Sequence, residues 1–224
     1  MLSKKYRKAL EFAADLHAEH FRKGTEIHYL SHLLSVSALV MENGGSEDQA
    51  IAGLLHDAIE DQGDNYTSRF FGPPARGRAA LKRDLALLFG ETVRDIVVAC
   101  TDDDDCPAGH KEQDKSVESW RSRKERYLAK LRKTTDTGIL RVSSADKLHN
   151  ARAILADYLE LGEELWPRFG KKTRADHLWY YASLATIFTE RAATLEDREN
   201  ARMAKELTVV LERIRAFAAR PATA

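Results

Sequence analysis

The sequence predicts an all-α protein, a single helical bundle of about eight to ten helices. Apolar residues recur every three or four positions along most of the chain, which is the spacing of one helix face. Period-two alternation is scarce and no hairpin dipeptide separates two apolar runs, so strands are not expected. Glycine, asparagine and proline interrupt the periodic runs. These observations favour helices packed around one core.

The composition is that of one globular domain. The chain has 224 residues, 43% of them hydrophobic and 31% charged, unlike a disordered or membrane protein. Lys plus Arg and Asp plus Glu are both 35, so the zero net charge requires no nucleic-acid partner. No apolar stretch approaches the ~20 residues of a membrane span, and the charged N-terminus lacks a signal-peptide core. We therefore expect one cytoplasmic domain over residues 1–224, not bound to membranes, with Cys100 and Cys106 reduced.

Three helices are expected in the first third of the chain. Residues 2–21 and 29–41 carry leucine, alanine and valine at helical spacing, and glycines follow both segments. Ser46 is a typical N-cap for the next helix, with acidic residues in its first turn. We expect this third helix to include residues 50–61 and to end near Gly63.

Two irregular segments separate the remaining helices. Residues 64–78 are basic and contain Gly72-Pro73-Pro74, and residues 102–115 are polar, so both are expected to be loops. The last residues, from Arg220, are expected to fray. Apolar residues at helical spacing predict further helices over residues 79–89, 91–100, 120–131, 137–161, 174–193 and 198–218.

The third helix carries an unusual group of ionisable residues. His56-Asp57 and Glu60-Asp61 directly follow the apolar run 50–55. On a continuous helix, His56 would lie over Glu60 and Asp57 over Asp61. Burying carboxylates without a partner costs several kcal/mol or more. A metal ion is the most economical partner for one histidine and three acids in about two turns.

Two distant residues could complete a metal site. His32 lies among apolar residues on the second expected helix, and Asp146 lies in the apolar part of residues 137–161, one turn before Asn150. A lone histidine on an apolar helix is more often a packed core residue. The ordered combination is stronger evidence, because two imidazoles and two carboxylates suit Mn, Fe or Zn better than Mg or Ca.

The order of these residues resembles the H…HD…D signature of the HD superfamily of metal-dependent phosphohydrolases. More narrowly, residues 56–61, HDAIED, resemble the HDxxED motif of the RelA/SpoT-type hydrolase domain, which removes the 3′-pyrophosphate from (p)ppGpp. Further segments resemble that family in order along the chain: Arg22-Lys23-Gly24, Tyr29, Phe89-Gly90-Glu91-Thr92-Val93, Thr101-Asp102-Asp103 and Ala145-Asp146-Lys147-Leu148-His149-Asn150.

The resemblance covers about residues 3–160 and implies an HD-domain helical bundle. Packing helices over about residues 173–219 match only loosely. No synthetase or regulatory domain follows, so the chain resembles the small stand-alone hydrolases. The implied reaction is metal-dependent hydrolysis of the 3′-pyrophosphate of guanosine tetra- or pentaphosphate, giving GDP or GTP and pyrophosphate.

The resemblance also implies three groups of site residues. The metal, Mn²⁺ or another divalent transition metal, is held by His32, His56, Asp57 and Asp146. The catalytic pair, placed to orient water and move its proton, is Glu60 and Asp61. The residues implied to bind the nucleotide substrate are Arg22, Lys23, Tyr29 and Asn150.

The sequence departs from the family pattern in two places. The prolines usual just before the tyrosine and just after the first histidine are replaced by His28 and Leu33. Residues 64–84 form a longer and more basic segment than the family's loop. Both departures bear on the choice of substrate, because this segment could line the mouth of the site.

Other residues have weaker support. The basic segment 120–127 is either an exposed charged face or a source of phosphate contacts, through Lys115, Arg121 or Lys124. His149 is expected to support the metal ligands or to pack beside them. Histidines without motif support are expected at the surface or in the core: His17, His20, His110 and His177. Aromatic residues expected to pack between helices are Trp120, Trp166, Trp179, Tyr180 and Tyr181.

Two alternative functions stay open. The chain could be an HD phosphohydrolase acting on another nucleotide, such as NADPH, a dNMP or a cyclic nucleotide. It could also be a non-catalytic nucleotide-binding module on an HD scaffold, although the intact ligands and acidic pair disfavour this. All three hypotheses have a small-molecule nucleotide as partner, and none predicts an oligomeric state.

Overall fold

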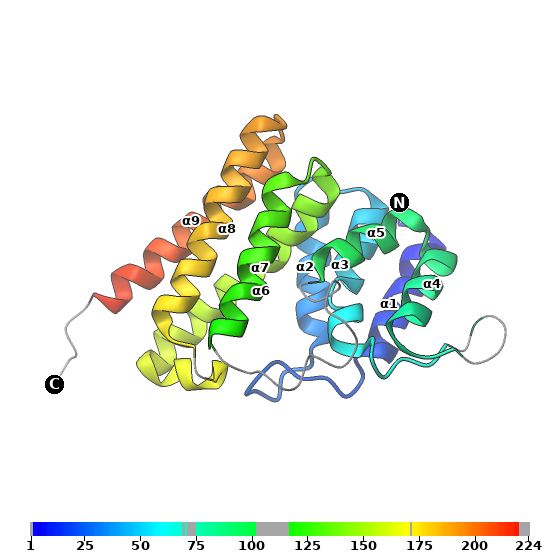
Figure 1. Ribbon diagram of the computed structural model, residues 1–224, viewed down its shortest axis with the longest axis horizontal. Coiled ribbons are helices and arrows are strands. Elements are labelled where there is room, and N and C mark those ends of the chain that lie inside the picture. The colour runs from blue at the N-terminus through cyan, green and yellow to red at the C-terminus, as the bar shows by residue number, and fades with distance from the viewer. Residues whose placement is uncertain (1, 69, 71–74, 102–116, 171, 220–224) are drawn as a thin grey trace.

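The computed structural model describes residues 2–68, 70, 75–101, 117–170 and 172–219 (Figure 1). These residues form helices and turns, with two isolated bridges and no strand, so the prediction of an all-α fold is confirmed. The α-helices are α1 (Lys4–Leu16), α2 (Leu30–Glu42), α3 (Glu47–Leu55), α4 (Gly77–Phe89), α5 (Glu91–Cys100), α6 (Val117–Lys133), α7 (Thr137–Leu161), α8 (Arg174–Thr194) and α9 (Arg198–Ala218). Two short helices complete them: η1 (Ala58–Gln62), a π-helical turn, and η2 (Gly162–Phe169), a 3₁₀ segment.

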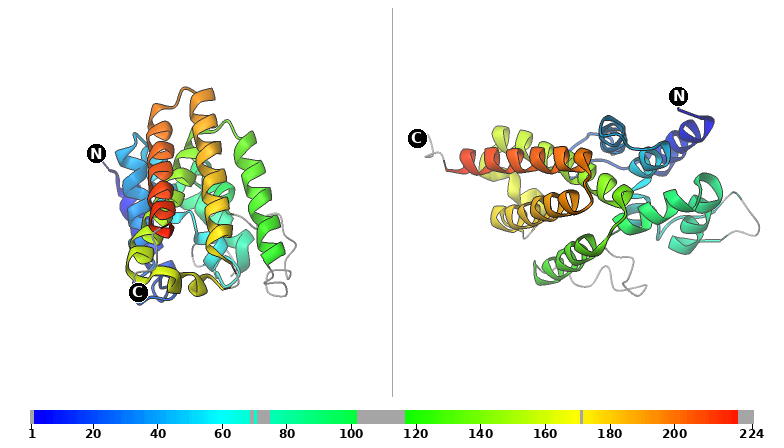
Figure 2. Two further views of the ribbon diagram at one scale, coloured as in Figure 1. Left: turned by 90° about the vertical axis from the view of Figure 1, so that its left-hand side faces the viewer. Right: turned by 90° about the horizontal axis from the view of Figure 1, so that it is seen from above.

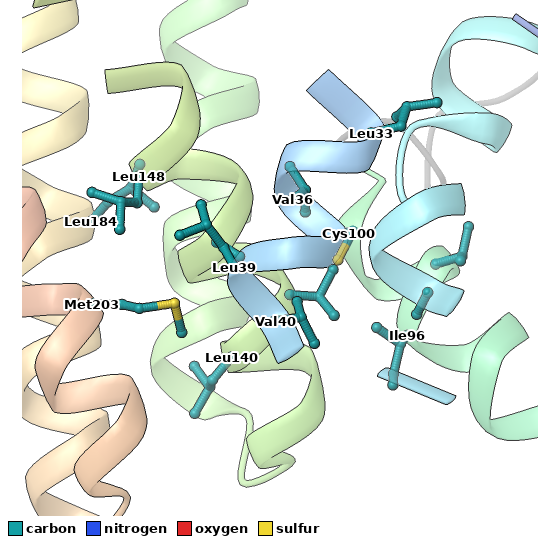
Figure 3. Packing of buried hydrophobic residues seen from close by; sticks show 14 of the residues in the cluster. Leu33, Val36, Leu39, Val40, Ile96, Cys100, Leu140, Leu148, Leu184 and Met203 are labelled. Atoms are coloured by element: carbon teal, nitrogen blue, oxygen red, sulfur yellow. The ribbon is translucent and has the colours of Figure 1, made fainter. Parts of the chain in front are cut away.

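Helix α7 joins the two sides of the molecule. It packs against α2, α3 and α5 on one side and against α8 and α9 on the other (Figures 1 and 2). Helices α8 and α9 form an antiparallel hairpin, and α6 packs along α8. The buried residues of both sides form one continuous core, part of which is drawn in Figure 3. Residues on α7 therefore face partners from both ends of the sequence.

Small residues bring α2 and α3 close together. All six residues from Ala50 to Leu55 are buried. A Cβ atom on Gly53 would lie 3.1 Å from the Cα atom of Ser37, so glycine lets the two backbones approach without this tight contact. The close approach fixes the distance between α2 and the residues that follow α3.

Helix caps agree with the sequence where the chain offers capping side chains. Ser46 caps α3 as predicted, and its side chain and that of Gln49 form a reciprocal capping box. The Asp136 carboxylate caps α7 by accepting from the amides of Gly138 and Ile139. The starts of these two helices are thus determined locally.

Two helix ends were wrongly predicted. Helix α1 ends at Leu16 instead of residue 21, and the chain turns back so that Phe21 and His28 form an isolated bridge. Helix α3 ends at Leu55 instead of near Gly63 and gives way to η1. Apolar spacing could not reveal this second change, because Ala58 and Ile59 stay fully buried on either kind of turn.

Other boundaries differ less. Helices α5, α7 and α9 have the predicted bounds, and α8 is one residue longer. Helices α4 and α6 begin two and three residues earlier than predicted, and η2 was not predicted. The expected loop over residues 102–115, Cys106 and the end from Arg220 lie outside the described residues. Within the described part of the chain, no helix is long and apolar enough to cross a membrane.

A buried ion pair ties α7 to the start of α9. Arg141 Nη2 donates to Asp197 Oδ1 and Oδ2 at 3.1 and 3.2 Å, and Arg141 Nη1 donates to Gln49 Oε1 at 3.0 Å. The Asp197 side chain also caps α9 by accepting from the amide of Asn200. One guanidinium therefore connects the first turns of α3 and α9 through α7.

Replacing this arginine is expected to destabilise the fold. Arg141→Met leaves the Asp197 carboxylate buried without its cation, which lowers the free energy of unfolding by about 3–5 kcal/mol. The matched control is Arg152→Met, because Arg152 also links α7 to α9 through Glu206 but both side chains are more than 40% exposed. The control substitution should lower the free energy of unfolding by at most about 1 kcal/mol. Urea unfolding of both variants measures the difference. Equal effects would contradict the claim that the buried Arg141–Asp197 pair stabilises the fold more than the exposed pair.

Candidate metal centre and adjoining cavity

Four predicted ligands from three segments meet at one point. His32 comes from α2, His56 and Asp57 from the turn after α3, and Asp146 from α7. His32 Nε2 lies 3.2 Å from Asp146 Oδ1 and 3.6 Å from Asp57 Oδ2. His56 Nε2 lies 2.9 Å from Asp57 Oδ2 and 3.5 Å from Asp146 Oδ1. The structure thus brings together all four residues that the sequence singled out for metal binding.

The histidine rings are oriented with one nitrogen free for a cation. His56 Nδ1 donates to the carbonyl of Gly53 at 2.9 Å, which leaves Nε2 with a lone pair. His32 Nδ1 lies 2.8 Å from Nδ1 of His149, so His149 supports a ligand as expected. Both Nε2 atoms are buried and lack a hydrogen-bond partner among the described residues.

These distances fit a divalent transition metal. An ion with bonds of about 2.0–2.2 Å places adjacent ligand atoms about 3.0–3.5 Å apart. The four nitrogen–oxygen separations span 2.9 to 3.6 Å. A buried pair of lone-pair nitrogens facing two carboxylates is unfavourable without a positive charge between them. The residues present therefore fit a bound metal ion.

The electrostatics of the cluster agree with this assignment. Burial lowers the pKa of His56, but Asp57 and Asp146 outweigh it, and the pKa lies well above its usual range. The carboxylates therefore hold a proton on this ring until a metal ion displaces it and takes up the lone pair of Nε2. Burial raises the pKa of Asp146, yet Lys147 and His56 hold it well below the usual range. The pKa of Asp57 is likewise low, with His56 and His32 outweighing burial. The site favours ionised carboxylates and demands a nearby cation.

Glu60 and Asp61 lie on η1 rather than on a continuation of α3. The expectation of one regular helix through these residues is therefore wrong, although the Asp61 amide still donates to the Asp57 carbonyl at 2.9 Å, one turn back. Burial, then Asp57 and Glu60, raise the pKa of Asp61 to about 8. Glu60 is half-buried beside it. A π-helical turn changes the direction of successive side chains, and such turns are frequent at functional sites.

The predicted substrate residues contact the metal ligands. Tyr29 Oη donates to Asp57 Oδ2 at 2.6 Å, and burial followed by Asp57 raises the pKa of this phenol. Asn150 Nδ2 donates to Asp146 Oδ1 at 2.5 Å and Asn150 Oδ1 accepts from Arg22 Nη1 at 3.0 Å. A series of hydrogen bonds thus links Arg22 to Asp146, one of the four candidate metal ligands.

A cavity of about 350 Å³ adjoins this series of hydrogen bonds. All four predicted substrate residues line it, together with residues from α6, α7, η2 and α8. Its further basic side chains are Lys124, Lys147 and Arg168, and its aromatic and imidazole side chains include Trp120, Phe169, His177, Tyr180 and Tyr181. The cavity combines phosphate-binding cations with apolar faces, the composition of a nucleotide site.

Some lining residues were not predicted. Trp120, Tyr180 and Tyr181 are buried packing residues as expected, but they also line the cavity. Lys124 lines the cavity, in line with the alternative that the basic segment 120–127 supplies phosphate contacts. Arg121 instead stacks over Trp179, with its Cζ atom 3.2 Å from the ring centroid. Their position depends on how α6 packs on α8, which no sequence motif encodes.

Several other segments singled out from the sequence are not found at this cavity. Lys115 and His110 lie outside the described residues. No described residue of the basic segment 64–84 lines this cavity, so its expected place at the mouth of the site is not supported.

Arg168 lines the cavity but was not predicted from the sequence. Its side chain covers Gly24, where a Cβ atom would lie 2.7 Å from Arg168 Cγ. Gly24 also has a φ of +70°, a conformation that favours glycine.

Removing one ligand should remove one ion. Asp146→Asn keeps the shape of the side chain but loses the charge, so the variant should hold one divalent ion fewer per chain. It should also lose most of the rise in melting temperature that metal gives the wild type. Emission spectrometry after gel filtration measures the first and calorimetry the second. Asp95→Asn, a substitution at an exposed position of α5, is the control. An unchanged metal content in Asp146→Asn would contradict the assignment of Asp146 as a metal ligand.

Comparisons with known proteins agree with this geometry. A profile of the HD domain family matches residues 9–172. The chain is 29% identical over 147 residues to guanosine-3′,5′-bis(diphosphate) 3′-pyrophosphohydrolase MESH1 of Xenopus tropicalis, which covers 64% of this chain and 66% of that protein. It is 44% identical over 54 residues to a probable guanosine-3′,5′-bis(diphosphate) 3′-pyrophosphohydrolase of Synechocystis sp., covering 24% of this chain and 7% of that protein. The matches thus span just under two thirds of the first relative and a small part of the second.

Two solved structures share the fold. A metazoan ortholog of SpoT, which hydrolyses ppGpp and plays a role in starvation responses, superposes with a TM-score of 0.62 at 22% identity, covering 94% of this chain and 96% of that chain. The lmo0812 protein of Listeria monocytogenes EGD-e superposes with a TM-score of 0.59 at 23% identity, covering 85% and 99%. At these identities the likeness concerns the fold alone. Because the profile spans most of the sequence, the chain belongs to the HD domain family.

Proposed function

We propose that this chain removes the 3′-pyrophosphate from guanosine tetra- and pentaphosphate by metal-dependent hydrolysis, giving GDP or GTP and pyrophosphate. The observation that carries the proposal is a basic cavity next to the metal cluster, since Tyr29 and Asn150 line the cavity and also bond to Asp57 and Asp146. The named activities of the Xenopus relative and of the metazoan SpoT ortholog support the substrate class.

The donor set favours Mn²⁺ as the ion, because two imidazole nitrogens and two carboxylate oxygens form a mixed site. When bound, the ion polarises a phosphoryl oxygen and lowers the pKa of coordinated water. The chain's own part is to hold His32 and His56 with Nε2 directed at that position. Their Nδ1 contacts to His149 and to the Gly53 carbonyl do this.

The basic residues of the cavity are proposed to bind the substrate phosphates. Arg22 and Lys23 come from the loop after α1, and Lys124, Lys147 and Arg168 come from α6, α7 and η2. Cations from several segments can contact a polyphosphate on more than one side. Lys147 Nζ is already 2.7 Å from Asp146 Oδ2, which places one of these cations beside the ligand set.

Glu60 and Asp61 are proposed to orient the attacking water and accept its proton. Both lie on η1, one turn beyond Asp57. An acid with a pKa raised toward neutrality, as for Asp61, can take up a proton near physiological pH. Water attack at the 3′-linked phosphorus then releases pyrophosphate and leaves a free 3′-hydroxyl. The cytoplasmic location, the single-domain organisation and the absence of a nucleic-acid partner stay predictions.

The substrate class is tested with a panel. Metal-loaded protein is incubated separately with ppGpp, NADPH, dNMPs and cyclic nucleotides, and released pyrophosphate and phosphate are measured. The expected result is pyrophosphate from ppGpp at a rate well above that of any other release. Phosphate from NADPH as the main product would assign a different nucleotide. Bound nucleotide without turnover would instead favour a non-catalytic module.

The role of the acidic pair is tested by Glu60→Gln. Loss of a positioned proton acceptor should lower kcat by about 10²-fold or more, while bound metal and the KM for ppGpp change little. Steady-state kinetics and metal analysis of the same preparation measure both. Glu160→Gln, at an exposed position of α7, is the control. If Glu60→Gln lost metal in proportion to activity, Glu60 would be a ligand and not a proton acceptor.

A further inference from the structure

Three side chains outside the four-ligand set converge beside it. His17 follows the last turn of α1, His20 lies three residues further on, and Asp61 lies on η1. His17 Nδ1 is 3.0 Å from His20 Nδ1, and His20 Nδ1 is 3.8 Å from Asp61 Oδ2. One ligand atom from each residue lies within 4.8 Å of the other two. Among the described residues, the only other group with this property is the one containing His32, His56 and Asp57.

The spacing of these atoms is that of ligands around one ion. Bonds of about 2.0–2.2 Å to nitrogen and oxygen put neighbouring ligand atoms about 3.0–3.5 Å apart. The separation of the two Nδ1 atoms, 3.0 Å, lies within that range, and the distance from His20 Nδ1 to Asp61 Oδ2, 3.8 Å, is slightly longer. Two imidazoles and one carboxylate, with remaining positions open to water, are the protein ligands of many open transition-metal sites.

The two histidines are held in place before any ion binds. His17 is 2% exposed, and its Nε2 atom is buried without a hydrogen-bond partner in the described structure. The His20 ring stacks on Tyr29 with centroids 4.0 Å apart, and the Tyr29 amide donates to the His20 carbonyl at 2.8 Å. Burial and stacking thus keep the two Nδ1 atoms 3.0 Å apart on the side that faces Asp61.

The charges of the region also favour a second cation. One divalent ion balances Asp57 and Asp146, and Asp61 adds a further carboxylate on the adjoining turn. The two groups are physically connected, because Tyr29 stacks on His20 and donates to Asp57 Oδ2 at 2.6 Å. A positive charge at Asp61 would therefore act directly beside the first ion.

We propose that His17, His20 and Asp61 bind a second divalent transition-metal ion next to the four-ligand site. The mixed nitrogen and oxygen donors suit Mn²⁺, Co²⁺, Fe²⁺ or Zn²⁺ better than Mg²⁺ or Ca²⁺. The inference goes beyond the proposed function, since ion binding does not depend on which nucleotide is hydrolysed. It also refines the shared role proposed above for the acidic pair: Glu60 accepts the proton, and Asp61 holds the second ion beside the attacking water.

Metal counting tests the proposal without any substrate. Chelator-treated protein is dialysed to equilibrium against Co²⁺ and, separately, Mn²⁺, and bound metal is measured by emission spectrometry. Wild-type protein should hold two ions per chain. His20→Gln and Asp61→Asn should each hold one, and the visible absorption of the Co²⁺ form should fall accordingly. Asp146→Asn should retain an ion that is lost when His20→Gln is added.

The control is His28→Gln, an exposed histidine in the same loop that belongs to neither group. His20 is only half-buried, so His20→Gln avoids the folding problem that a change at buried His17 would bring. Circular dichroism confirms folding of each variant. One ion in wild type, with no loss in His20→Gln, overturns the inference and leaves the proposed function intact. Two ions without hydrolysis of ppGpp would sink the proposed function and leave the inference intact.

Discussion

The need for a positive charge between two buried imidazoles and two buried carboxylates governs the centre of this molecule. His32 and His56 face Asp57 and Asp146 at 2.9 to 3.6 Å, and neither Nε2 atom has a hydrogen-bond partner among the residues that the structure describes. The surrounding fold serves this arrangement. Gly53 lets α2 and α3 approach, and α7 carries Asp146 into the gap from the other side of the bundle. The arrangement makes sense only as a cation site.

The site lies where regular helical geometry stops. Helix α3 ends at Leu55, and the motif continues through a π-helical turn that carries Glu60 and Asp61. This turn carries the two acids beyond Asp57 while keeping Ala58 and Ile59 in the core. Tyr29 then connects the ligand Asp57 to the histidine stack at the end of α1. Chemistry-bearing side chains are thus placed by local departures from the helix, and their positions are held by packing.

Sequence reasoning identified the helices and the four side chains that the structure brings together, because both have strong local signatures. Periodic apolar residues define α5, α7 and α9 to the residue, and the spacing of His32, His56-Asp57 and Asp146 is chemically distinctive. It failed where tertiary contacts decide. The apolar pattern continued to Phe21, although that ring is 42% exposed and α1 ends five residues earlier. His17 and His20 carried no motif, and a three-residue spacing of histidines was the only available signal.

The aromatic side of the cavity comes from a later part of the chain than the metal cluster. Tyr180 and Tyr181 lie on α8, beyond residue 172 where the match to the HD domain family ends, and the hairpin of α8 and α9 is anchored through the Arg141–Asp197 pair. The metal cluster and these tyrosines therefore come from different parts of the bundle, and only tertiary packing brings them together. A substitution that shifts the hairpin would alter the aromatic wall of the cavity, while His32, His56 and Asp57 keep their places on the other side of α7.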